Sequence, residues 1–268
     1  MIIGNREYDT TKNCFIMGIL NVTPDSFSDG GKFQVIDSAL RQAEKMVEEG
    51  ADIIDVGGES TRPGYKIISQ YAEIDRVTPV IDALQDRFDV PISIDSYKSA
   101  VAMAALEAGA VLVNDIWGLK HDNEMAEVIA RSGASCCLMH NRHNMDYTDF
   151  MSDMLDDMAE SLRIADRAAI PRNKIILDPG IGFAKTYEMN LLAINKLDMM
   201  HKFGLPILLG TSRKSVIGLT LDVPVDDRIE GTIATTVIGI MRGCSFVRVH
   251  DVKEIKRTVV MAKAVLTA

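Results

Sequence analysis

The sequence predicts an α/β fold, a single (β/α)8 barrel over residues 1–268. Short apolar runs recur eight times along the chain, with polar loops and amphipathic stretches between them. The runs are continuous rather than alternating, which is typical of parallel strands covered on both sides. Eight strand–helix repeats in about 250 residues are the proportions of this barrel. The alternative is an open doubly wound sheet, which the eightfold count and the lack of a two-part division disfavour.

The apolar runs define the expected strands, and the stretches between them define helices. The strands are expected over residues 14–22, 52–58, 90–96, 111–118, 135–140, 175–180, 206–212 and 245–250. Helical spacing is found over residues 34–50, 97–109, 156–169, 187–202 and 252–267. Gly50 and Gly109 end two of these stretches, as glycine does at helix C-termini. We expect residues 1–9 to form a small β-hairpin across the bottom of the barrel.

Composition and charge exclude several classes of function. The formal net charge is −9 and the sequence contains no basic tract, which argues against electrostatic binding of nucleic acid. No apolar run reaches the roughly 18 residues of a membrane-spanning helix. The first residues lack the basic start and apolar core of a signal peptide. We therefore expect a cytoplasmic protein that does not associate with membranes.

The cysteines are expected to be structural. Cys14, Cys136, Cys137 and Cys244 form no C-x-x-C pair and lie in or beside apolar runs. Free, buried thiols in a reducing compartment fit this pattern. A role as metal ligand or nucleophile is the lesser alternative.

Polar residues follow nearly every expected strand. In a parallel barrel these strand ends meet around one pocket. Asp95, Asn114 and Asp178 can together hydrogen-bond the edge of a flat, nitrogen-rich heterocycle, because carboxylates match adjacent N–H donors. Taken singly, each aspartate would be interpreted as a helix cap or a loop carboxylate.

Basic residues on the same predicted face indicate an anionic ligand. These residues are Arg62, Arg213, Lys214, Arg248 and His250. The stretch GTSRKS offers backbone N–H groups at a helix start, although it lacks the ending of a Walker A loop. Asn21 and His250 end the first and last strands, which are neighbours in a closed barrel. They could support a magnesium–phosphate complex; a structural hydrogen bond at each is the alternative.

Seven motifs, in order along nearly the whole chain, resemble the dihydropteroate synthase family. They are MGILNVTPDSFSDGG, GADIIDVGGESTRPG, ISIDS, VNDIWG, DPGIGFAKT, LLGTSRKS and VRVHDV. The resemblance implies a TIM barrel and a transferase of folate biosynthesis that is a sulfonamide target. Such an enzyme condenses 6-hydroxymethyl-7,8-dihydropterin pyrophosphate with p-aminobenzoate to give 7,8-dihydropteroate and pyrophosphate.

The resemblance also implies a role for each candidate residue. The implied catalytic residues are Asp95, Lys214 and Arg248. The implied pterin contacts are Asp95, Asn114, Asp178, Lys214 and Arg248, and the implied pyrophosphate contacts are Thr61, Arg62, Arg248 and His250. The implied p-aminobenzoate side comprises Phe27, Ser28, Pro63, Phe183, Ser212 and Arg213. The resemblance further implies Mg²⁺ held by Asn21, a homodimer, and two mobile loops that order over the second substrate.

The implied mechanism is dissociative. Departure of pyrophosphate leaves positive charge conjugated into the pterin ring, which Asp95 can stabilise. Magnesium and Arg62 stabilise the departing anion. The neutral aniline nitrogen then attacks while the loops keep water away.

Two alternatives stay open at this point. A pterin-binding methyltetrahydrofolate methyltransferase could share Asp95, Asn114 and Asp178, but would not need the TPDSFSDGG loop or the phosphate contacts; pyrophosphate release separates the two. A non-catalytic pterin-binding protein is the second alternative. The stretch LMHNRHNMDYTDF and Lys66 receive no role.

Overall fold

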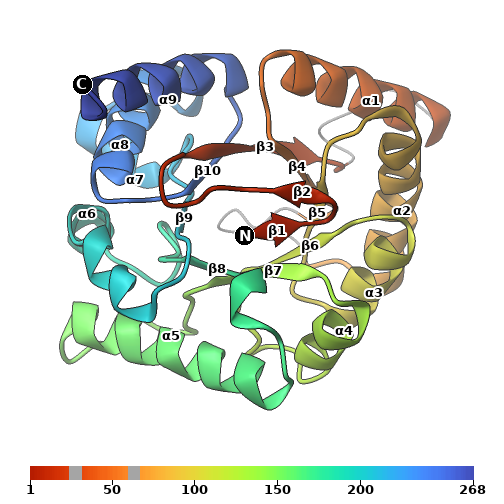
Figure 1. Cartoon of the computed structure of the whole chain (residues 1–268), viewed down its shortest axis with the longest axis horizontal. Coiled ribbons are helices and arrows are strands. Elements are labelled where there is room, and N and C mark those ends of the chain that lie inside the picture. Colours follow the sequence, from red (N-terminus) through yellow and green to blue (C-terminus); the bar gives the residue numbers. More distant parts are fainter. Residues whose placement is uncertain (24–31, 60–66) are drawn as a thin grey trace.

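The computed structural model describes residues 1–23, 32–59 and 67–268, and within them it confirms the barrel. Eight parallel strands form one sheet in the order β8-β7-β6-β5-β4-β3-β10-β9 (Figure 1). A parallel bridge between Leu177 and Ile207 joins β8 to the chain just before β9 and so closes the ring. The strands are β3 (Phe15–Asn21), β4 (Ile53–Gly57), β5 (Ile92–Asp95), β6 (Leu112–Asp115), β7 (Ser135–Met139), β8 (Ile175–Asp178), β9 (Leu208–Leu209) and β10 (Phe246–Val249).

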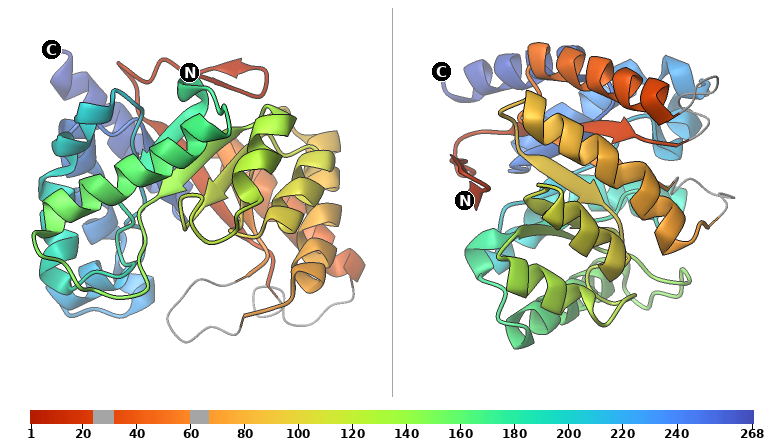
Figure 2. Two further views of the ribbon diagram at one scale, coloured as in Figure 1. Left: turned by 90° about the horizontal axis from the view of Figure 1, so that it is seen from below. Right: turned by 90° about the vertical axis from the view of Figure 1, so that its right-hand side faces the viewer.

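Helices surround the sheet on its outer face, as Figures 1 and 2 show. They are α1 (Lys32–Glu48), α2 (Gln70–Arg87), α3 (Ser99–Glu107), α4 (Met125–Ser132), α5 (Phe150–Arg167), α6 (Tyr187–Asn195), α7 (Ser215–Leu221), α8 (Ile229–Met241) and α9 (Val252–Leu266). Short 3₁₀ helices are η2 (Arg172–Lys174), η3 (Leu197–Phe203) and η4 (Val225–Asp227). Gly50 and Gly109 follow α1 and α3 with φ of +100° and +110°, so the predicted helix stops are confirmed.

Two predicted helices are wrong in their extent. The stretch 156–169 belongs to α5, which begins at Phe150 because the Asp149 side chain accepts from the Ser152 N–H and caps the helix there. The stretch 187–202 is divided into α6 and η3, because Lys196 leaves the α-helical region with φ −108° and ψ 24°. The tighter 3₁₀ turn repeats every three residues. It therefore places Leu197 and Met200, both fully buried, on one face.

The N-terminal hairpin closes one end of the barrel, as predicted. Strands β1 (Ile2–Ile3) and β2 (Arg6–Glu7) pair antiparallel. Ile3 and Tyr8 are buried with the first residues of the barrel strands, and the Tyr8 ring meets the Phe15 ring edge-on with centroids 4.8 Å apart. The hairpin thus lies across the amino-terminal ends of the strands, where Figure 2 shows it at one end of the molecule.

The interior of the barrel changes from apolar to polar over two residues of β4, β6, β8 and β10. The buried lower layer comprises Met17, Ile53, Leu112, Cys137, Ile176, Leu208 and Phe246. Side chains of a strand point to the same face at every second residue. Two residues further along, the same face therefore carries Asp55, Asn114, Met139, Asp178 and Arg248, while Asp95 pairs in register with Asn114. This upper layer, at the carboxyl ends of the strands, is where barrel enzymes place their active sites.

The cysteines behave as predicted. All four are free; Cys136, Cys137 and Cys244 are buried and Cys14 is half-buried. Burial raises the pKa of the Cys136 and Cys137 thiols, so neither is a thiolate at neutral pH. No helix within the described ranges is long and apolar enough to cross a membrane.

Candidate active site

An arginine shared by two carboxylates lies at the centre of the upper layer. Arg248 on β10 donates from Nε to Asp55 Oδ2 at 2.6 Å and from Nη2 to Asp95 Oδ2 at 2.5 Å. The side chain of Asp55 is fully buried, and those of Asp95 and Arg248 are 9% and 19% exposed. The pairing joins strands β4, β5 and β10 across the barrel.

Asp55 is a candidate functional residue that the sequence analysis missed. Its Oδ2 also accepts from Asn114 Nδ2 at 3.1 Å, so one carboxylate holds both Arg248 and Asn114. Its buried Oδ1 has no hydrogen-bond partner among the described residues. The signal was its position two residues after Ile53, which points both side chains to the same face of β4.

Asp178 and Lys214 lie on the opposite side of the ring, where the charge of each affects the pKa of the other. Asp178 ends β8, and its Oδ1 accepts from the backbone N–H of Gly180 at 2.7 Å. Both groups border Gly210: a β-carbon built on Gly210 would lie 3.7 Å from Lys214 Nζ and 4.0 Å from Asp178 Oδ2. The absence of a side chain at Gly210 leaves this space open.

Lys214 is also held by the chain that follows β8. Its Nζ donates to the carbonyl oxygen of Ile181 and lies 5.0 Å from the centroid of the Phe183 ring. This is within the range of a cation–π contact. The structure therefore brings Phe183, predicted from the resemblance, next to Lys214.

Burial brings the pKa values of Asp95 and Lys214 closer to neutral pH. It raises the pKa of Asp95 to about 7; Arg248 opposes the shift and the Asp55 charge adds to it. Burial also raises the pKa of Asp178, against the effect of Lys214, and lowers the pKa of Lys214 to about 8. Burial alone would lower the pKa of Arg248, but Asp95 and Asp55 raise it above its ordinary value. A permanent guanidinium thus lies beside Asp95, a carboxylate that titrates near neutral pH, and such a pattern is typical of active sites.

An apolar group borders the charged layer. Tyr97, Ile116 and Met139 are buried together, and Trp117 and Phe183 pack against them. Ile116 and Met139 come from the ends of β6 and β7. Apolar walls beside convergent polar groups are the usual make-up of a small-molecule site.

Asn21 ends β3 beside Gly57, in register. A β-carbon built on Gly57 would lie 3.6 Å from Asn21 Oδ1 and 3.7 Å from Asp95 Oδ2, so both oxygens border the same space. A neutral amide oxygen is a suitable ligand for Mg²⁺, which usually takes its other ligands from phosphates and water. The part of the chain described here contains no group of three His, Cys, Asp or Glu residues that would hold a metal alone. The residues therefore fit a magnesium ion brought with a phosphorylated substrate.

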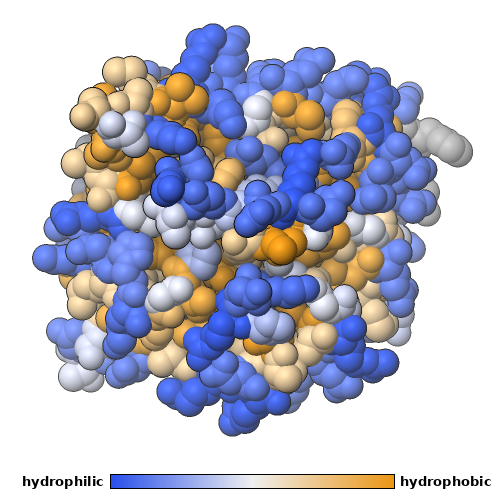
Figure 3. Space-filling view, viewed as in Figure 1, coloured by the Kyte–Doolittle hydropathy of each residue, from blue (hydrophilic) through white to orange (hydrophobic). Residues whose placement is uncertain are grey.

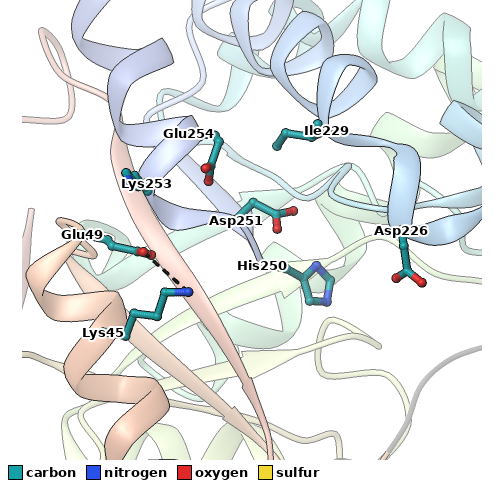
Figure 4. A pocket seen from close by; sticks show the side chains of 8 residues that line it. All are labelled: Lys45, Glu49, Asp226, Ile229, His250, Asp251, Lys253 and Glu254. Atoms are coloured by element: carbon teal, nitrogen blue, oxygen red, sulfur yellow. Dashed lines mark ion pairs between the residues drawn. The ribbon is translucent and has the colours of Figure 1, made fainter.

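His250, Ser212 and Arg213 lie together at the carboxyl end of β10. Ser212 Oγ is 3.0 Å from His250 Nδ1 and accepts from the His250 N–H at 3.2 Å. Arg213 makes a bidentate pair with Asp251, at 2.5 and 3.1 Å. His250 also lines a cavity of about 470 Å³ (Figure 4), bordered by Lys45, Glu49, Asp226, Ile229, Asp251, Lys253 and Glu254. Since α1, α8 and α9 bound that cavity, it is distinct from the charged layer inside the barrel.

Five predicted site residues lie outside the described residues. They are Phe27, Ser28, Thr61, Arg62 and Pro63. The structure brings together Asp95, Asn114, Asp178, Lys214, Arg248 and Phe183, and places Asn21 and His250 at the ends of the neighbouring strands β3 and β10.

Comparison with known proteins identifies the family. A family model described as pterin binding enzyme matches residues 17–250. The dihydropteroate synthase of Clostridium beijerinckii is 57% identical over 99% of this chain and 99% of its own length. The chain belongs to the dihydropteroate synthases. They are transferases, so the predicted enzyme class is confirmed, and the methyltransferase alternative has no support from these relatives.

Solved structures of dihydropteroate synthases share the fold. The Clostridium difficile enzyme, solved in the presence of pteroic acid, is 50% identical with a TM-score of 0.95, covering 97% of this chain and 99% of that one. The Xanthomonas albilineans enzyme with 4-aminobenzoic acid is 35% identical with a TM-score of 0.92, covering 96% and 95%. The backbone of a dihydropteroate synthase is therefore retained over nearly the entire chain.

Proposed function

We propose that this chain condenses 6-hydroxymethyl-7,8-dihydropterin pyrophosphate with p-aminobenzoate to give 7,8-dihydropteroate and pyrophosphate. The observation that carries the proposal is the buried layer of opposite charges around Arg248 and Lys214, in a chain of this family. The relatives solved with pteroic acid and with 4-aminobenzoic acid hold the product skeleton and the second substrate.

In this proposal, two polar side chains hydrogen-bond to the edge of the pterin. Asp178 accepts hydrogen bonds from adjacent ring N–H donors, and Asn114 offers an amide whose orientation Asp55 fixes. Ile116 and Met139 supply apolar contacts for the flat ring. Arg248 is held in place by its two carboxylates and stacks along the pterin.

The charges then stabilise the reacting group. As the carbon–oxygen bond to pyrophosphate breaks, positive charge develops on the pterin methylene and spreads into the ring. Ionised Asp95 stabilises this charge because it is already oriented by Arg248 and needs no reorganisation. The aniline nitrogen of p-aminobenzoate attacks the methylene carbon and loses its proton. Lys214 and Phe183 border the side from which we propose that p-aminobenzoate enters.

Magnesium is proposed as the cofactor, with the Asn21 amide oxygen as its protein ligand. When bound, it neutralises charge on the departing pyrophosphate. Thr61, Arg62 and His250 are the proposed anion contacts of the chain itself. Pro63, Ser212, Arg213, Phe27 and Ser28 remain the proposed p-aminobenzoate contacts.

The proposed function is tested by incubating the protein with both substrates and Mg²⁺. Formation of dihydropteroate and an equal amount of pyrophosphate is expected, and a chelator should suppress both. Pterin binding without product would instead support the non-catalytic alternative. Product formation unaffected by the chelator would contradict the magnesium assignment alone.

Asp178→Ala is expected to weaken pterin binding about fivefold to 150-fold. The substitution leaves the donor edge of the ring without an acceptor in a dry pocket, which costs about 1–3 kcal/mol. Calorimetric titration with a pterin measures the effect. Asp198→Ala, at an exposed side chain of η3, is the control that should bind normally. Equal affinity of folded Asp178→Ala and wild type would place the pterin elsewhere.

We also propose a cytoplasmic homodimer. Buried free thiols suit a reducing compartment. The support for a dimer is an exposed apolar surface where α8 packs beside α9, visible at the upper left of Figure 3. It comprises Ile238, Met241, Val260, Met261, Val265 and Leu266, each at least 41% exposed. Apolar patches of this kind mark interfaces between chains.

Sedimentation is expected to give twice the 29.5 kDa mass of the chain. The double variant Met241→Glu with Val260→Glu should sediment as a monomer, since it would bury charges in the proposed interface. Met103→Glu, at a comparably exposed methionine on α3, is the control. A monomeric wild type, or a double variant that stays dimeric, contradicts this surface.

A further inference from the structure

A buried hydrogen-bonded chain lies behind the turn that follows β8. Lys185 Nζ is 2.8 Å from His140 Nδ1, and His140 Nε2 is 2.9 Å from Asp157 Oδ2. Arg142 Nε donates to the same Asp157 oxygen at 2.5 Å. The His140 side chain has no exposed surface, and Lys185 is 8% exposed. These hydrogen bonds connect α5 to the interior and use His140 and Arg142, which the proposed reaction leaves without a role.

The contacts assign the donors along this chain. Burial lowers the pKa of His140 to about 4, so its ring is neutral and has one donor and one acceptor nitrogen. The Asp157 carboxylate can only accept, which places the ring proton on Nε2 and makes Nδ1 the acceptor for Lys185 Nζ. Burial lowers the pKa of Lys185 to about 7, and the amine can donate to Nδ1 in either protonation state. Hydrogen bonds from His140 and Arg142 outweigh burial and keep the pKa of Asp157 below its ordinary value. Each member of the chain therefore orients the next.

The inner end of the chain holds the turn of residues 178–186. Lys185 Nζ also donates to the Phe183 carbonyl oxygen at 3.0 Å. The His140 N–H donates to the Asp178 carbonyl oxygen at 2.9 Å, and a β-carbon at Gly180 would lie only 2.0 Å from the His140 carbonyl oxygen. The turn is thus pressed against the β7 end with no space to shift.

The backbone conformation of the turn explains why it depends on contacts from the surrounding residues. Gly180, Gly182 and Ala184 have φ of +69°, +85° and +44°, so three of its residues occupy the left-handed region. For the non-glycine Ala184 this conformation is costly and persists only where surrounding contacts impose it. Asn190 Oδ1 accepts from the Gly182 N–H at 2.6 Å, and Tyr147 Oη donates to the Ala184 carbonyl oxygen at 2.9 Å.

We propose that Lys185, oriented by His140 and Asp157, is a positioning residue for the p-aminobenzoate side of the site. It acts through Phe183, whose carbonyl it binds and whose ring lies against Lys214. This inference rests on the proposed function. Asp178 keeps its own bond to the Gly180 N–H and its place at the end of β8, so the pterin side depends less on Lys185.

The test is steady-state kinetics of Lys185→Met with both substrates varied. The KM for p-aminobenzoate is expected to rise at least tenfold, while the dissociation constant for the pterin changes less than threefold. Asp157→Asn, at a partly exposed residue, should raise the KM for p-aminobenzoate by a smaller factor, again with little change in the dissociation constant for the pterin. This variant provides the test if Lys185→Met does not fold. His140→Asn retains an acceptor for Lys185 but loses the contact with Asp157, so it should resemble Asp157→Asn, whereas His140→Leu should match Lys185→Met.

Ile176→Val, in the lower apolar layer, is the control for lost stability and should lower the melting temperature without changing either constant. A normal KM for p-aminobenzoate in folded Lys185→Met overturns the inference. The inference is also overturned if the KM for p-aminobenzoate and the dissociation constant for the pterin rise together, in step with a fall in melting temperature. A wild-type protein that makes no dihydropteroate contradicts the proposed function and this inference with it, whereas an active wild type with unaffected variants contradicts the inference alone.

Discussion

Asp95→Asn is expected to lower kcat about a hundredfold while leaving the barrel folded. Asparagine keeps the shape of the side chain but removes the negative charge that faces the developing pterin cation. Loss of one preorganised electrostatic partner costs on the order of 3 kcal/mol in the barrier. Single-turnover rates at saturating substrates measure the effect, and a circular dichroism melt shows whether the fold is retained.

The pH dependence gives a second measurement of the same group. Asp95 must be ionised to act, and burial raises its pKa to about 7. The kcat/KM for the pterin substrate should therefore fall as pH drops through about 7, since the free enzyme then gains a proton on Asp95. This acid limb should be absent from the residual activity of Asp95→Asn.

Asp115→Asn is the matched control for this variant. Asp115 is also a buried carboxylate at a strand end, one residue from Asn114 but on the opposite face of β6. It accepts from the backbone N–H groups of Trp117 and Leu119, at 2.8 and 2.6 Å, and so belongs to its own loop. Its substitution should affect stability more than kcat. Near wild-type turnover of Asp95→Asn would defeat the role assigned to Asp95.

The barrel could be predicted from the sequence because its determinants are local. Each strand is a continuous apolar run, and glycines such as Gly50 and Gly109 mark helix ends. One exception was the stretch 187–202, whose helical spacing does not encode the backbone change at Lys196. Burial of Leu197 and Met200 against the core decides that change, and tertiary contacts of this kind are not visible in one segment.

The candidate site was predicted in part for the same reason. Asp95, Asn114 and Asp178 end their apolar runs, so a strand-end rule finds them. Asp55 lies in the middle of a run and was missed, because its role depends on Arg248 and Asn114 from two other strands. Lys185 and His140 were likewise left without a role, since the contact between them joins residues 45 positions apart.

Asp55→Asn is expected to lower kcat/KM for the pterin substrate about thirtyfold to a hundredfold. Asp55 holds both Arg248 and Asn114 through one oxygen, and breaking a buried charge pair leaves its partner poorly compensated. A factor of this size corresponds to about 2–3 kcal/mol of lost transition-state stabilisation. The measurement is initial-rate kinetics at several pH values.

The pH profile of this variant distinguishes an electrostatic role from a structural one. The Asp55 charge raises the pKa of Asp95, and Arg248 lowers it. Without the Asp55 charge, Arg248 has Asp95 as its remaining carboxylate partner, so the pKa of Asp95 should fall. The acid limb of kcat/KM should therefore move to lower pH. Asp52→Asn, on a carboxylate that precedes β4 and accepts from the Ile16 N–H, is the control and should keep the wild-type profile. If Asp55→Asn loses activity while its acid limb stays in place, Asp55 only supports the packing of the barrel, and the shared-arginine account of the site is wrong.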